Sequence, residues 1–308
     1  MSAKTIRKSL ILLLTAAIWG FAFVAQSVGG DVIGPFAFNF SRFVIGAVVL
    51  LPIIGIKKIS HKDTRAPKAK TDKKNLLVGG LLCGICLCAG SCLQQVGLYF
   101  GTNVGKAGFL TACYILIVPI IGLFLKKKCG INVWIGVALA LVGLYLLCIK
   151  EGFSIKGSDL IVLLCALFFS LQIMVIDHYS PLVDGVRLSC LQFATAGVIS
   201  FILTIIIDLK GNILGLGGIF TTLFTDMYAL IPVLYAGVLS CGVAYTLQII
   251  GQEGLNPTIA SLVMSFESVF SVLGGWLILH EKLSVKELVG CGLVFIAIML
   301  AQINFEKK

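Results

Sequence analysis

Two charged residues of this chain lie inside apolar runs that are long enough to cross a membrane. Glu267 lies near the middle of one run, and Arg42 lies in the outer half of another. A charged side chain at the centre of a bilayer costs from about 2.5 to well over 10 kcal/mol, depending on the method. A carboxyl group in such a place can bind a substrate or carry a proton. The structural alternative is an Arg42–Glu267 or Glu267–glutamine pair that only fixes the packing of helices.

The helix face that carries Glu267 is too small and too polar to contact lipid. At helical spacing, its neighbours are Ala260, Met264, Ser271 and Gly274. We therefore expect Glu267 to face the interior of a helix bundle. Arg42 is expected either to take part in coupling or to be a structural charge, as a buried or snorkelling anchor. The sequence leaves the protonation state of Glu267 open.

Two glutamines occupy matching positions in a Leu-Gln-x-x-Gly pattern that occurs twice. Gln94 and Gln248 are 154 residues apart, and each shares its helix face with small residues. An amide there can line a cavity or bond a neighbouring helix, and both interpretations stay open. Trp19 and Tyr245 can wall a cavity, although single aromatic residues in spans more often pack. The predicted substrate-binding residues are Trp19, Gln94, Tyr245, Gln248 and Glu267, with Gln172 and Gln192 as weaker candidates.

The repeat extends beyond the two glutamines. The same offset carries Leu125 onto Leu279, Lys128 onto Lys282 and Gly136 onto Gly290. A chain of 308 residues that repeats itself at half its length indicates duplication of one unit. In a membrane protein, such internal symmetry indicates a pathway between the two halves.

Composition places this chain in a membrane. Hydrophobic residues make up 58% of it, charged residues 12%, and the mean hydropathy is +1.06. Because soluble domains are about 25% charged, a water-soluble fold is excluded. A spanning helix needs roughly 20 apolar residues, and the sequence holds ten such runs. They lie near residues 9–28, 35–56, 75–99, 104–125, 132–149, 158–177, 187–208, 227–250, 257–279 and 284–304.

These runs predict an all-α membrane protein with ten transmembrane helices in two inverted five-helix repeats. The first repeat is expected to cover residues 1–150 and the second residues 151–308. Because five is an odd number, the second repeat enters the membrane from the opposite side. The pseudo-twofold axis between the repeats therefore lies in the membrane plane.

The positions of the basic residues predict the orientation. If the N-terminus is inside, 17 of the 24 Lys and Arg residues lie on inner segments and six on outer ones. Positive loops stay on the cytoplasmic side, so we expect both termini to be cytoplasmic and the membrane to be the plasma membrane. Residues 57–74 are expected to form a disordered cytoplasmic loop. Residues 211–226 are expected to lie along the outer interface.

The sequence does not favour other classes of function. The net charge of +10 does not indicate nucleic-acid binding, because the aromatic residues lie in apolar runs rather than among the basic ones. We expect no metal and no cofactor: on one helix Cys92 points opposite Cys83, and Cys88 lies far from both, which favours packing. No motif of a hydrolase or a phosphate loop is present, so an enzyme is not expected. No obligate protein partner is expected either.

Several local motifs carry a resemblance to one transporter family. They are residues 18–24, 40–43, 105–111 with 118–119, 266–270 and 279–284. With them, the chain resembles the EamA-type branch of the drug/metabolite transporter superfamily over nearly its whole length. The first half departs from the pattern, because Lys127-Lys128-Cys129-Gly130 lacks the acidic residue that Glu281 provides in the second half. We therefore interpret Glu281 as a structural residue at a helix end.

The repeat and the resemblance together predict a secondary transporter that moves a small-molecule substrate by alternating access. The resemblance implies amino acids or related amphipathic metabolites, and it favours export over uptake. Proton coupling through Glu267 is a hypothesis, and a passive facilitator without ion coupling is the alternative. The sequence leaves the substrate, the direction, the coupling ion and the oligomeric state open.

Overall fold

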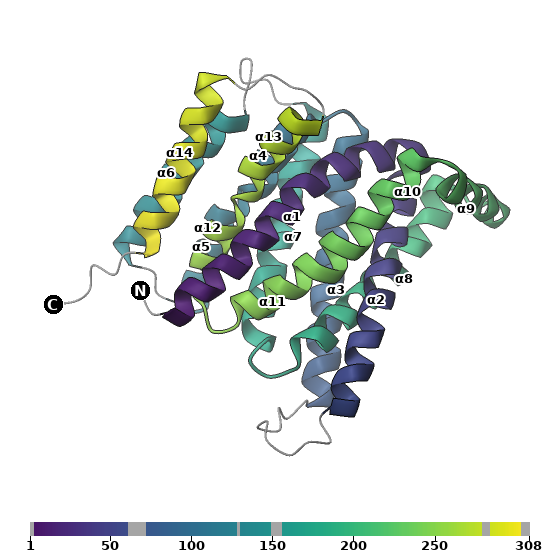
Figure 1. The fold of residues 1–308 in the computed structure, drawn as a ribbon, viewed down its shortest axis with the longest axis horizontal. Helices are drawn as coiled ribbons and strands as arrows, with labels where there is room; N and C mark the ends of the chain where they lie inside the picture. The colour runs from purple at the N-terminus through teal and green to yellow at the C-terminus, as the bar shows by residue number, and fades with distance from the viewer. Residues whose placement is uncertain (1–2, 61–71, 128–129, 149–155, 279–283, 303–308) are drawn as a thin grey trace.

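The computed structural model describes residues 3–60, 72–127, 130–148, 156–278 and 284–302, and every regular element in this part of the chain is helical. Figure 1 shows the resulting bundle. In chain order the elements are α1 Ala3–Ile33, α2 Pro35–Ser60, α3 Lys73–Tyr99, α4 Val104–Ala112, α5 Tyr114–Phe124, α6 Ile131–Cys148, α7 Gly157–Tyr179, α8 Gly185–Leu203, η1 Thr204–Asp208, η2 Ile213–Gly215, α9 Leu216–Thr225, α10 Met227–Leu234, η3 Tyr235–Tyr245, α11 Thr246–Gln252, α12 Pro257–Met264, α13 Glu267–Ile278 and α14 Val285–Gln302.

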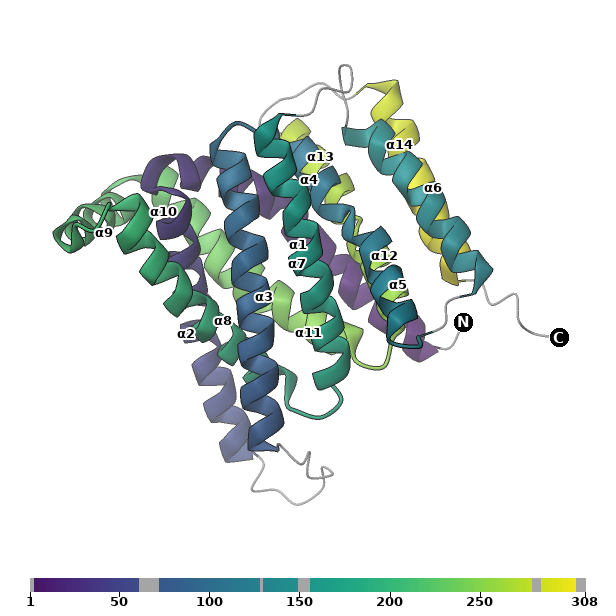
Figure 2. The ribbon, with the colours of Figure 1, turned by 180° about the vertical axis from the view of Figure 1, so that it is seen from behind.

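Eight stretches of the described chain are long and apolar enough to cross a membrane. They are Thr5–Ile33, Pro35–Ile56, Lys73–Tyr99, Val104–Phe124, Gly157–Tyr179, Gly185–Asp208, Met227–Gln252 and Pro257–Ile278. The remaining two predicted runs form α6 and α14, which pack against each other at one edge of the bundle (Figures 1 and 2). The count of ten spans therefore stays a prediction for that pair.

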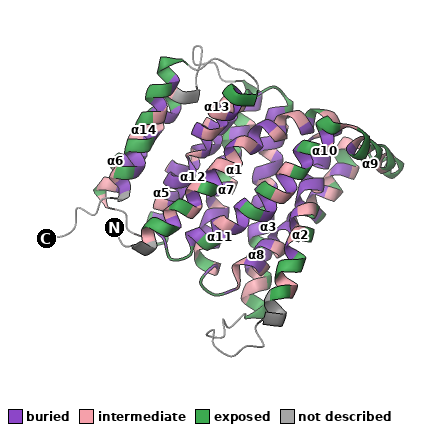
Figure 3. Ribbon diagram, in the orientation of Figure 1, coloured by how far each residue is buried: buried purple, intermediate pink, exposed green. Residues whose placement is uncertain are grey.

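Many residues on the outside of the bundle are exposed (Figure 3), and they include many large apolar residues. Phe124 is 84% exposed and Ile131 70%, and Leu51 on α2 is also exposed. A soluble protein rarely exposes contiguous apolar surface on this scale. The helices instead present it to lipid, while their backbone groups are satisfied within each helix.

Two of the spans are broken near their middle in the same way. The span of α4 and α5 breaks at Cys113 (φ −58°, ψ −10°), and the span of α12 and α13 breaks after Ser265 (φ −60°, ψ −11°). Each span begins with an asparagine cap, Asn103 or Asn256, whose side chain accepts a hydrogen bond from the backbone two residues on. The shared pattern places both breaks at the same depth along their spans.

Serine hydroxyls satisfy carbonyl groups around the second break. The Ser265 hydroxyl donates to the Leu262 carbonyl at 2.7 Å, and the Ser271 hydroxyl donates to the Ser268 carbonyl at 2.8 Å. The Ser268 hydroxyl donates across the interface to the Gly108 carbonyl of α4 at 2.9 Å. Irregular backbone inside a membrane is tolerated where neighbouring groups satisfy it in this manner.

Three pairs of helices that match under the predicted repeat pack against each other in antiparallel fashion. In α6 and α14, Asn132 donates to the Ala301 carbonyl at 3.0 Å, so the start of one helix meets the end of the other. In α2 and α8, the ring centres of Phe40 and Phe201 lie 5.0 Å apart with the rings tilted by 47°, and the Cys190 thiol contacts the Ala47 carbonyl. The third pair is the two broken spans, in which α4 packs against α13 and α5 packs against α12.

The segments between the spans differ in part from the prediction. Helix α2 continues to Ser60 and α3 begins at Lys73, so the ends of the predicted loop 57–74 are helical, and residues 61–71 lie outside the described part. Residues 211–226 contain the short amphipathic helix α9, which projects at the edge opposite α6 and α14 (Figures 1 and 2). Its Phe224 is exposed, whereas Leu223 is buried.

Candidate functional site

A buried cavity lies between the two broken spans and helices α1, α2, α3, α7, η3 and α11. Trp19, Arg42, Gln94, Tyr245, Gln248 and Glu267, which are all the residues predicted for the site, line it. The space in it that water molecules can occupy is about 30 Å³. This is enough for one or two waters but not for a metabolite. In this structure the cavity is therefore smaller than a metabolite.

Glu267 is the first residue of α13, directly after the break in its span. It is 4% exposed, and its Oε1 atom has no hydrogen-bond partner. Tyr114, the first residue of α5 after the other break, also lines the cavity, and its buried hydroxyl interacts with the carboxyl group of Glu267. Tyr114 was not predicted from the sequence, because nothing in a run of apolar residues distinguishes this tyrosine from a packing residue.

Arg42 is buried, not snorkelling. It is 2% exposed and lies with its guanidinium carbon 4.8 Å from the centre of the Phe43 ring and 5.9 Å from that of Phe38. The predicted structural alternative was an Arg42–Glu267 ion pair. Among the ion pairs of the described residues, this pair does not occur, because the two charged groups do not approach within 4.0 Å. Both charged groups therefore line one cavity without neutralising each other directly.

The two repeat-related glutamines each line the cavity and also bond a neighbouring helix. Gln94 on α3 donates to the Thr111 hydroxyl on α4 at 2.9 Å. Gln248 on α11 and Gln172 on α7 exchange hydrogen bonds of 3.2 and 3.4 Å. Gln172 also donates to Gln192 on α8 at 3.3 Å. Each glutamine therefore lies at the cavity and also bonds a neighbouring helix, so that the two possibilities from the sequence do not exclude each other.

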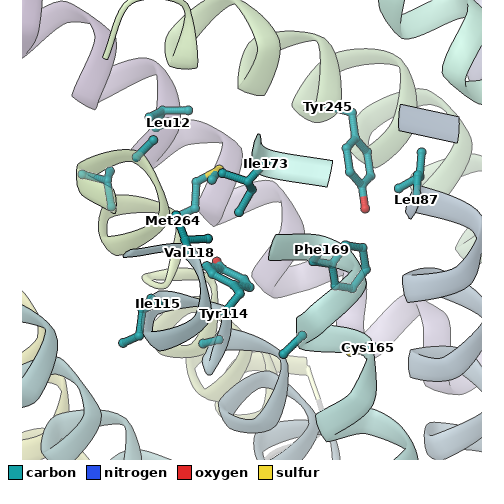
Figure 4. Close-up of a cluster of buried hydrophobic side chains, with 14 of the residues drawn as sticks. Leu12, Leu87, Tyr114, Ile115, Val118, Cys165, Phe169, Ile173, Tyr245 and Met264 are labelled. Atoms are coloured by element: carbon teal, nitrogen blue, oxygen red, sulfur yellow. The ribbon is translucent and has the colours of Figure 1, made fainter. Parts of the chain in front are cut away.

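Aromatic side chains form much of the wall. Trp19 and Tyr245 lie with their ring centres 4.6 Å apart at an angle of 55°, and Tyr245 meets Phe193 edge to face at 5.9 Å. Figure 4 shows Tyr114, Phe169 and Tyr245 directed into the space between the helices. Phe169 was not predicted, because a lone phenylalanine carries no signal beyond packing.

No group of three or more metal-ligating side chains occurs among the described residues. One sequence expectation about the cysteines is wrong: Cys88 and Cys92 lie on one face of α3, with sulfur atoms 3.8 Å apart. The contact follows from helical spacing, because residues four apart in a helix are neighbours on its surface. Glu281 lies outside the described residues, so its predicted structural role is untested.

Comparisons with known proteins identify the family. The EamA-like transporter family matches the chain twice, over residues 7–149 and again over residues 156–302. The chain therefore belongs to this family, as its resemblance predicted. Together with the eight apolar spans, this membership makes it a multi-pass membrane protein.

Relatives and a solved structure agree with this assignment. The chain is 29% identical over 305 residues to an uncharacterized transporter of Archaeoglobus fulgidus, covering 98% of this chain and 87% of the relative. It is 25% identical to the uncharacterized transporter YoaV of Bacillus subtilis, covering 94% of this chain and 95% of that one. A crystal structure titled only as that of a protein has the same fold, with a TM-score of 0.72, 18% identity and 96% of both chains covered. The family and the relatives' names indicate membrane transport rather than catalysis.

Proposed function

We propose that this chain is a secondary transporter that carries small metabolites, namely amino acids or related amphipathic compounds, across the plasma membrane by alternating access. The observation that carries the proposal is the closed polar cavity at which the two broken spans meet. A buried site of about 30 Å³ cannot hold such a substrate without rearrangement. The protein would therefore open the cavity to one side of the membrane at a time, with the structure representing a closed state of that cycle.

The broken spans supply the places at which the helices can bend. Near Cys113 and Ser265 the regular hydrogen bonding of the helix is interrupted, so each half of a span can change its direction at low cost. Discontinuous helices at the centre of the membrane are common substrate sites in secondary transporters. Tyr114 and Glu267 begin the helical halves that follow these breaks, and their movement would reshape the cavity.

We infer that residues 1–150 and 151–308 form two inverted units that move against each other. The two separate family matches support this division, and the antiparallel packing of α2 with α8 and of α6 with α14 is expected for matching helices of opposite orientation. The start of α1, the end of α14 and the basic start of α3 lie toward the same, lower end of the bundle in Figures 1 and 2. This arrangement supports two cytoplasmic termini.

Glu267 is the proposed proton carrier of an export cycle. Its carboxyl group is buried in the cavity and has no cation within 4.0 Å among the described residues, so that no permanent ion pair competes with a proton. Glu267→Gln keeps the size of the side chain and removes the exchangeable proton. We expect this variant to remain folded and to lose transport driven by a pH gradient, while it retains exchange of substrate without a gradient.

The experiment reconstitutes the purified chain in vesicles and compares uphill accumulation with counterflow. A proton-coupled carrier accumulates substrate when a pH gradient is imposed, whereas a passive facilitator gives counterflow only. Gradient-driven accumulation that is undiminished in Glu267→Gln would exclude this role for Glu267. Equal behaviour of the wild-type chain with and without a gradient would favour the passive facilitator. Absence of any flux for a broad panel of amino acids and related metabolites would refute the substrate class.

A further inference from the structure

We propose that Arg42 binds the carboxylate group of the substrate through two parallel hydrogen bonds from one edge of its guanidinium group. A carboxylate is then required for binding. The inference rests on the proposed function in one respect, namely that the cavity is the substrate site. Arg42 lines this cavity and is 2% exposed. Its Nε and Nη2 atoms are buried and have no hydrogen-bond partner.

The two unpartnered atoms form one edge of the guanidinium group. An arginine presents its N–H donors in a fixed planar fork, and those on Nε and Nη2 point the same way along that edge. The spacing of the two donors matches the two oxygens of a carboxylate, which gives the strong paired contact typical of arginine. The atoms left without a partner in Arg42 are thus the pair that such a contact requires.

The surroundings of Arg42 hold the plane of the fork and leave its edge free. Phe43 and Phe38 lie near the guanidinium group at 4.8 and 5.9 Å, measured to the ring centres. Neither ring supplies a hydrogen-bond acceptor for an N–H group. A buried cation without an acceptor is costly, and a bound carboxylate would remove that cost.

The charges of the cavity favour a single carboxylate over a phosphate. Of the described residues that line it, Arg42 is the one cation and Glu267 the one acid. A dianion such as a phosphate monoester would keep an uncompensated negative charge close to Glu267. One carboxylate balances the charge of Arg42, and the amide groups of Gln94 and Gln248 remain for neutral contacts.

The test measures binding to the purified full-length chain in detergent, by thermal stabilisation and calorimetry. The probes are L-phenylalanine, L-leucine and 3-phenylpropionate, each compared with its methyl ester, and the amines phenethylamine and isoamylamine. Aromatic and branched probes suit a wall that contains Trp19, Phe169 and Tyr245. We expect at least one acid to bind and its ester and amine to bind at least about tenfold more weakly, which is the size of effect of losing a charged hydrogen-bond pair.

Variants then assign the preference to Arg42. Arg42→Gln should abolish the difference between acid and ester, and Arg42→Lys should retain only part of it, because an ammonium group lacks the fork. Arg187→Gln removes an arginine that does not line the cavity and should behave as the wild-type chain. If Arg42→Gln does not fold, the acid and ester comparison on the wild-type chain decides alone.

Three results would overturn the assignment. They are an ester or amine that binds as tightly as its acid, an acid preference that survives in folded Arg42→Gln, and the absence of a carboxylate-dependent shift for every probe. Flux in vesicles separates this inference from the proposed function. Carboxylate-selective binding without flux would refute transport and support the role of Arg42 in binding. Flux without a preference for carboxylates would support transport and refute the role of Arg42.

Discussion

Gly20 on α1 allows a close approach of α1 to α13, and its replacement by alanine tests this packing. A Cβ atom at Gly20 would lie 2.3 Å from Cβ of Phe270 and 2.7 Å from the carbonyl oxygen of Glu267. Carbon atoms in contact are about 3.5–4.0 Å apart, so α1 and α13 would have to separate by roughly 1.2–1.7 Å. Both contacts are to backbone or to the first side-chain atom, so rotation of a side chain cannot relieve them.

The expected cost is that of overpacking a closely packed interior, about 1–3 kcal/mol. Alanine also favours a helix over glycine by about 0.8–1.0 kcal/mol, which offsets part of this cost. Gly55→Ala on α2 is the matched control, because no atom lies within 4 Å of the Cβ that it adds. The helix-propensity gain is common to both variants, so the difference between their stabilities isolates the packing of α1 against α13.

The measurement is the thermal unfolding midpoint of the three purified proteins in one detergent. For soluble proteins of 150–250 residues, 1 kcal/mol corresponds to roughly 2–4 °C, so we expect Gly20→Ala to unfold several degrees below Gly55→Ala. We also expect reduced flux, since the added methyl group displaces the segment that positions Glu267. If Gly20→Ala unfolds at the same temperature as Gly55→Ala and transports normally, the close approach of α1 and α13 is refuted.

Two further substitutions test the polar contacts around the cavity. Gln248→Leu should destabilise the chain by about 1–3 kcal/mol because it leaves the buried amide of Gln172 without this partner, and a Gln172→Leu/Gln248→Leu double variant should recover part of the loss in a double-mutant cycle. Additive losses would contradict the bond between them. Asn256→Ala removes the cap of α12 and should cost about 0.5–2 kcal/mol, whereas Asn256→Asp, which keeps an acceptor, should cost less; equal losses on thermal unfolding would argue against the cap.

The sequence predicted well which side chains meet at the cavity. It did not predict the breaks in the helices that position some of them. Glu267, Arg42 and the two glutamines stand out because a polar group in an apolar run needs a polar environment, and only the centre of a bundle provides it. Their small neighbouring residues indicated the face that turns inward. Whether these residues bind substrate stays a prediction, because lining a cavity does not by itself establish a contact with a ligand.

The break before Glu267 could not be predicted from its own residues. Ser265 and Phe266 are both compatible with a regular helix, and no proline or glycine marks the site. At the break the Ser265 hydroxyl donates to the Leu262 carbonyl of its own span, and the Ser268 hydroxyl donates to the Gly108 carbonyl of α4. Such a long-range hydrogen bond is invisible to local patterns. The contact of Cys88 with Cys92, in contrast, was available from helical spacing alone.

The two broken spans have similar backbone conformations at their breaks but different residues after them. This difference bears on how transport could be coupled to protons. Each span breaks at nearly the same backbone angles, and the first residue of the following helix lines the cavity in both cases. That residue is Tyr114 in the first half and Glu267 in the second. The carboxyl group of Glu267 can take up and release a proton, whereas a phenol such as that of Tyr114 ordinarily keeps its proton near neutral pH, since its reference pKa is about 10. Any proton that the cycle carries is therefore expected on one half only, while both halves supply the bend that opens the cavity.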